Sequence, residues 1–262
     1  MAALTDWLDN PALTDYVNGD DTLVRYFLKA ASVATDITPV NIYGVQEVSP
    51  DAVKYGIEEE IYHSGGGRTK IKRRPEFTVN IPIFASRVDT FVGAIHSQVF
   101  GSSSSYYANV LTFDDVPRIN LEIVYRLPDM THVGSLVLCN LIPQDFTPGS
   151  KTGNQIVQVP FYSRFIPVKL AAGARCVLDK FNGDGSITTF TLSQTPLNLM
   201  DMDVGLKDEF VLDNVIYVET KSSTATVGTL VKKDITIVGT TLTFSTAPAA
   251  GTTVEVFYAC AA

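Results

Sequence analysis

Alternation of apolar and polar residues is the main pattern of this chain from Pro39 onward. The stretch INLEIVYRL, residues 119–127, places Ile, Leu, Ile and Tyr on one side of an extended strand and Asn, Glu, Val and Arg on the other. Such alternation predicts a half-buried strand. We therefore expect Glu122 to lie on a largely polar face, where its replacement leaves folding intact. Further strands are predicted in VNIYGVQEV, EFTVNIPIF, GSLVLCNLI and NQIVQVPFYSRF.

One segment departs from this pattern and predicts an amphipathic helix, SRVDTFVGAIHSQVFG at residues 86–101. Ser86 stands at the N-cap position, Asp89 follows at capping-box spacing, and a glycine ends the segment. Apolar residues recur in steps of four, three and four, which forms one stripe. The stripe consists of Val88, Val92, Ile95 and Val99. A single helix among strands must pack this stripe on a sheet, so the predicted fold class is mainly β (α+β).

The composition changes near residue 178, which predicts a second domain. FNGDGSITTFTLSQTPLN opens a threonine-rich segment of short strands separated by turn signals such as VGTT and APAAGTT. In GTTVEVFYA, residues 251–259, Val and Tyr alternate with Glu and Phe, as in a strand. We therefore expect a β domain over residues 1–177 and a small β-sandwich over residues 178–262. Few core contacts should cross that boundary, and the second domain should be dispensable for assembly.

A charged, glycine-rich segment, EEEIYHSGGGRTKIKRRPEF, occupies residues 58–77. A nucleotide-binding P-loop runs into a Lys-Ser/Thr pair that opens a helix, whereas these glycines run into alternating, β-rich sequence. Three consecutive glycines are costly to order without a partner. We predict a mobile loop or hairpin that orders against acidic surface on adjacent subunits. Its candidate interface residues are Gly65, Gly66, Gly67, Arg68, Lys70, Lys72, Arg73 and Arg74.

Composition describes a folded protein, with 45% hydrophobic and 18% charged residues among 262. No apolar run approaches the ~20 residues that span a membrane, and the acidic start of the chain lacks the features of a signal peptide. The three cysteines are widely spaced without a CxxC pair, which favours buried or free thiols. The net charge of −8 argues against a protein that grips DNA through its phosphates.

The residues that catalysis or metal binding requires do not gather in any familiar pattern. No HExxH spacing joins the three histidines, no GxSxG is present, and the acids are scattered or form runs such as Glu58–Glu60. NGDGS, residues 182–186, begins like a calcium loop, but Ile187 and Ser193 stand where that loop needs glycine and an acid. A turn is the better interpretation. We expect no enzyme activity, no cofactor and no bound metal.

Two resemblances follow from these segments. The pattern of FNGDGSITTFTLSQTPL and ITIVGTTLTFSTAPAAGTTVEVFY, within residues 181–258, resembles small β modules that decorate bacteriophage tails, fibres and capsids. The N-terminal layout resembles the tail tube protein of long-tailed phages, in which a β-sandwich or barrel carries one flanking helix and a long loop between early strands. This chain departs from that family in its first 35 residues and in its appended C-terminal segment.

The resemblance implies a structural virion protein whose subunits stack, as hexameric rings, into the conduit for DNA ejection. The long loop would contact the neighbouring ring, and DNA would pass without specific binding. Other tail proteins would be its partners, with no membrane involved, and its location would be the virion tail after synthesis in the host cytoplasm. Two alternatives remain open: a receptor-binding protein of the tail tip or fibre, and a capsid decoration protein.

Overall fold

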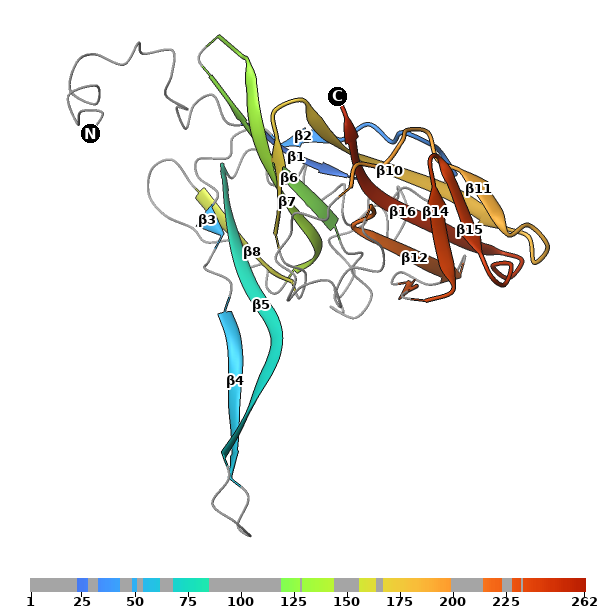
Figure 1. The fold of residues 1–262 in the computed structure, drawn as a ribbon. Helices are drawn as coiled ribbons and strands as arrows, with labels where there is room; N and C mark the ends of the chain where they lie inside the picture. The colour runs from blue at the N-terminus through green and yellow to red at the C-terminus, as the bar shows by residue number, and fades with distance from the viewer. Residues whose placement is uncertain are drawn as a thin grey trace, which may run out of the picture.

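The structure is a computed structural model, and its described elements are all β-strands (Figure 1). It describes residues 23–27, 33–42, 49–50, 54–61, 68–84, 119–127, 129–143, 156–163, 167–198, 214–222, 228–231 and 233–262. The prediction of a mainly β protein is therefore confirmed. The predicted helix at 86–101, with Val88, Val92, Ile95 and Val99, lies outside the described residues and stays a prediction.

The first half of the chain forms a curled, nine-stranded antiparallel sheet, here called the N-terminal sheet. Its main order is β2-β1-β6-β7-β8-β5-β3, while β4 pairs with β5 and β9 pairs with β7. The strands are β1 (Leu23–Phe27), β2 (Val40–Ile42), β3 (Ser49–Pro50), β4 (Lys54–Ile61), β5 (Arg68–Phe84), β6 (Ile119–Arg126), β7 (His132–Pro143), β8 (Ile156–Ser163) and β9 (Val168–Ala171).

The second half forms two smaller antiparallel sheets. The central sheet has the order β10-β16-β12-β13, and the outer sheet has the order β11-β15-β14. The central sheet consists of β10 (Ala174–Gly183), β12 (Tyr217–Ser222), β13 (Thr229–Leu230) and β16 (Thr252–Ala261). The outer sheet consists of β11 (Thr189–Thr191), β14 (Ile235–Val238) and β15 (Thr241–Phe244).

The central sheet is covered on both faces by buried apolar side chains. Phe257 and Ala259 of β16 belong to a buried cluster that includes Phe27 and Val137 of the N-terminal sheet. Val254, Val256, Tyr258 and Cys260, which alternate with them along β16, belong to a second buried cluster with residues of the outer sheet such as Leu242. Each large apolar side chain fully buried in this way contributes about 1.5–3 kcal/mol to folding. The three sheets thus form successive layers, with the central sheet in the middle.

The segment of residues 33–39, here called the strap, joins the first two layers along the edge of β10. The Ile37 N–H donates to the Leu178 carbonyl at 3.0 Å, and the Lys180 N–H donates to the Ala34 carbonyl at 2.8 Å. The boundary expected after Val177 falls inside β10, whose ten residues all pair with β16. Independent folding of residues 178–262 stays a prediction.

The expectation that Glu122 lies on a polar, accessible face is wrong. Glu122 and Asn120 are 0% exposed, because the central sheet covers this face of β6. The Asn120 amide donates to the Tyr217 hydroxyl of that sheet at 2.7 Å and accepts from the Asn140 N–H at 2.9 Å. Alternation along β6 correctly separates its two faces, but both of them are buried.

Candidate assembly interface

The most prominent feature outside the packed sheets is a projecting hairpin (Figure 1). The arm, as it is named here, consists of β4 and residues 68–76 of β5, which pair from Lys54↔Glu76 out to Ile61↔Arg68. Beyond Glu76, β5 enters the N-terminal sheet and pairs with β8 from Phe77↔Ser163 to Phe84↔Ile156. One strand thus serves both as a sheet member and as half of the arm.

The base of the arm is held by buried packing. Val79 and Ile81 of β5 are 1% and 0% exposed, and Phe161 of β8, the register partner of Val79, is 0% exposed. β8 in turn pairs with β7 through Ile142↔Tyr162. The apolar alternation of FTVNIPIF therefore anchors the inner half of β5, while the charged outer half continues beyond the sheet.

A β-bulge marks the transition along the arm. Tyr55 pairs with Pro75 and Ile57 pairs with Lys72, so Arg73 and Arg74 together stand opposite Gly56. A bulge increases local twist and bends the strand that carries the extra residue. It therefore sets the direction in which the outer part of the arm leaves the sheet.

The structure locates the predicted interface residues as follows. The five basic residues, Arg68, Lys70, Lys72, Arg73 and Arg74, all lie on β5 within the arm. The two strands of the predicted hairpin are therefore present, as β4 and the outer half of β5. Gly65, Gly66 and Gly67 lie outside the described residues, and ordering of this segment on assembly stays a prediction.

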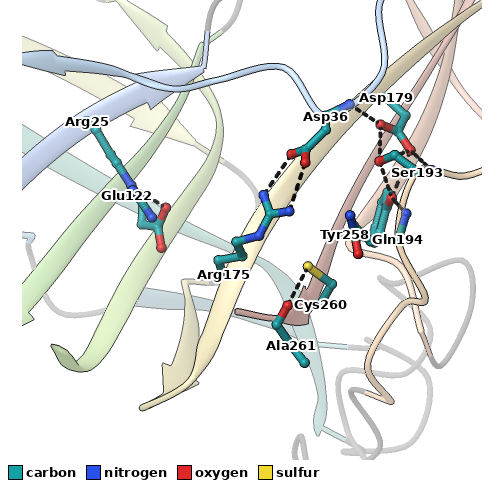
Figure 2. Close-up of polar contacts among 10 residues, drawn as sticks. All are labelled: Arg25, Asp36, Glu122, Arg175, Asp179, Ser193, Gln194, Tyr258, Cys260 and Ala261. Atoms are coloured by element: carbon teal, nitrogen blue, oxygen red, sulfur yellow. Dashed lines mark hydrogen bonds and ion pairs between the residues drawn. The ribbon is translucent and has the colours of Figure 1, made fainter.

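A polar cluster at the junction of the strap with the central sheet was missed by sequence reasoning (Figure 2). The buried Asp179 carboxylate accepts hydrogen bonds from the Asp36 N–H at 2.6 Å, the Ser193 N–H at 2.7 Å and the Tyr258 hydroxyl at 2.8 Å. Burial raises the pKa of the Tyr258 phenol, with further causes in the neighbouring Asp179 carboxylate. The cluster fixes the strap against β10 and β16.

Figure 2 also shows two ion pairs. The Arg175 guanidinium donates to both carboxylate oxygens of Asp36, at 2.7 and 2.9 Å, and this lowers the pKa of Asp36. In the N-terminal sheet, Arg25 Nε lies 2.8 Å from Glu122 Oε2, and the Ser135 hydroxyl donates to Glu122 Oε1 at 2.8 Å. Arg25, Glu122 and Arg175 are charged residues within strands, whereas Asp36 lies in the strap.

The described residues show few features that are typical of a catalytic or metal-binding site. Within them, no three His, Cys, Asp or Glu side chains come close enough together to hold a metal ion. None of the three buried cysteines forms a disulfide, in line with the prediction of thiols. NGDGS forms a turn as predicted, with the Asp184 carboxylate accepting from the Ser186 and Ile187 N–H groups. The described residues include no helix with the length and apolarity to cross a membrane.

No protein-family model matches the sequence, and no curated protein is significantly similar to it. Solved structures with a partly similar backbone include the tube-terminating cap of the anti-feeding prophage, at 14% identity and a TM-score of 0.36, covering 66% of this chain and 100% of that chain. The sheath–tube complex of an extracellular contractile injection system matches at 12% identity and a TM-score of 0.36, covering 66% of this chain and 100% of that chain. A chain from the virion of a native gene transfer agent matches at 14% identity and a TM-score of 0.34, covering 60% of this chain and 100% of that chain.

These neighbours are components of tail-like and phage-like particles. At such TM-scores the likeness to these structures is coarse.

Proposed function

We propose that this chain is a structural subunit of a phage-type tail tube, whose copies stack as hexameric rings around the conduit for DNA ejection. Its place would be the virion tail, beside other tail proteins, after synthesis in the host cytoplasm. The role is non-enzymatic and requires no cofactor. The net charge of −8 suits a conduit, because an acidic lining does not retain phosphates.

The arm is the observation that carries this proposal. In the described residues, β4 pairs with β5 alone. A two-stranded ribbon is marginally stable in water by itself and exposes unpaired edges. Such an element is expected to be covered by another molecule. Its position between early strands of a curled antiparallel sheet corresponds to the long loop expected from the tail tube resemblance.

The experiment compares the wild-type chain with a shortened-arm variant, in which residues 57–72 are replaced by an Asn-Gly turn. Negative-stain microscopy and sedimentation velocity would follow assembly, and thermal unfolding would follow the body. We expect rings or tubes from the wild type. The variant should stay monomeric while unfolding at the wild-type temperature, since the replaced residues pair within the arm and the β5–β8 ladder from Phe77 to Phe84 is kept.

The outcomes also separate the alternatives. Discrete trimers of the wild type would favour a tip or fibre protein, and monomers that bind capsids would favour a decoration protein. A shortened-arm variant that assembles as well as the wild type would show that the arm is not the assembly interface.

A further inference from the structure

The register of the arm separates its charges onto two faces outboard of the bulge. Cross-strand partners share a face of a β-ladder, and so do alternate residues along one strand. Ile57, Glu59 and Ile61 stand opposite Lys72, Lys70 and Arg68, so one face has three basic residues and one acid. We name it the basic face.

The opposite face of the same ladder is acidic. Glu58 stands opposite Ile71, and Glu60 stands opposite Thr69, so this acidic face has two acids and no basic residue between residues 57–61 and 68–72. Arg73 and Arg74 stand at the bulge and are assigned to neither face. The outer arm is therefore a ribbon with opposite charge on its two sides.

Most charged residues of the outer arm do not stand directly opposite a residue of the other sign. In the outer arm, residues 57–61 and 68–72, Glu59 and Lys70 stand directly opposite each other. The register partners of Arg68 and Lys72 are isoleucines, and those of Glu58 and Glu60 are Ile71 and Thr69. Two basic positions on one face and two acidic positions on the other thus have no residue of opposite charge directly across the ladder.

We propose that the arms of different copies bind each other through this charge complementarity: the acidic face of one arm binds the basic face of the next. This inference rests on the proposed function and names the contact through which subunits associate. The contact joins two different surfaces, so each bound copy keeps one acidic or basic face for a further copy. Such heterologous association repeats until a ring closes or a stack grows. If the basic face instead met the acidic body of a neighbour, the acidic face would gain nothing.

Charge-swap variants test the contact directly. One variant is Glu58→Lys with Glu60→Lys, which makes both faces basic. The other is Arg68→Glu with Lys72→Glu, which makes both faces acidic and keeps the Glu59–Lys70 pair. Each alone should need a roughly tenfold or higher concentration to assemble, because like charges then meet across the contact. An equimolar mixture should assemble near the wild-type concentration, with the two variants alternating.

Controls separate failure of this contact from failure of folding or of the proposed function. Lys169→Glu with Lys233→Glu makes the same charge change as the acidic variant at exposed positions of the body, and it should assemble like the wild type. All variants should unfold at the wild-type temperature. If the wild type forms tubes but the mixture fails to recover, or Glu58→Lys/Glu60→Lys assembles normally, the arms do not meet and only this inference falls. A wild type that never assembles would overturn both proposals.

Discussion

The arm and the central sheet are both antiparallel β-structure, but their surroundings differ completely. β16 in the central sheet is buried from Val254 to Cys260, with the N-terminal sheet on one face and the outer sheet on the other. The arm continues β5 past the edge of its sheet. The chain therefore supplies both partners for its central layer, whereas we propose that other copies supply the partner for its arm. Stability and assembly should then respond to different mutations.

Truncation should produce the largest effect. A chain that ends at Val177 lacks Leu178, Tyr217 and Phe257, which complete the cluster around Phe27. We expect no cooperative thermal unfolding from it, whereas the shortened-arm variant should unfold like the wild type. Calorimetry or circular dichroism would measure both. A cooperative transition in the truncated chain would instead show that residues 1–177 fold alone, as the sequence predicts.

Phe257→Ala should destabilise the body strongly without touching the arm. The Phe257 ring packs edge-on against Phe27, with centroids 5.1 Å apart, and lies 5.6 Å from the Tyr217 ring. Removing a buried phenylalanine costs about 3–5 kcal/mol. Val238→Ala, at a 78% exposed position, is the matched control and should change the unfolding free energy by less than about 0.5 kcal/mol. Similar denaturant midpoints for the two variants would contradict the layered core.

Glu122→Ala should come next, in contrast to the sequence-based expectation. It leaves Arg25 and the buried Ser135 hydroxyl without their shared acceptor. Breaking a buried pair costs about 3–5 kcal/mol. Because the Arg25 side chain is 24% exposed and retains contact with water, the lower end of that range is expected. Urea denaturation would measure it, and an unchanged midpoint would mean that β6 has an open face after all.

Alkaline pH should produce the smallest effect. The raised pKa of Tyr258 means that the fold favours the neutral phenol. Its contribution is complete below the ordinary tyrosine pKa of about 10 and is lost as pH rises above that value. The thermal midpoint should therefore fall more steeply from about pH 10 upward than in Tyr258→Phe. Parallel pH profiles of the two proteins would contradict this role for Tyr258.

Local pattern predicted the strands well, because alternation is a property of a strand itself. The prediction from INLEIVYRL matches β6, and EFTVNIPIF matches the inner half of β5. The same pattern gave a wrong prediction for Glu122, because the central sheet that covers its face is distant in sequence. Asn120 on that face and Tyr217 of the central sheet are 97 positions apart. In β16, Val and Tyr alternate with Glu255 and Phe257, yet both sets are buried between two sheets.

The candidate interface was partly predictable for the same reason. Three consecutive glycines followed by clustered basic residues are a local property of the sequence, and they distinguish this segment from the strands around it. The separation of its charges was not predictable, because it depends on which residue of β4 stands opposite which residue of β5. A shift of one residue would exchange the pairing of every glutamate in Glu58–Glu60.

The strap has a consequence for the order of events at the ribosome. Asp36 and Asp179, which it brings together, are 143 positions apart in the chain. At a synthesis rate of roughly 5–20 residues per second, the central sheet that covers β1 would be synthesised on the order of ten seconds after β1. During that interval Phe27 has no central sheet to pack on, and contacts of such sequence separation form slowly. Premature pairing of copies through their early strands is the hazard of this arrangement, and chaperones that hold the nascent chain should raise the yield of native subunits.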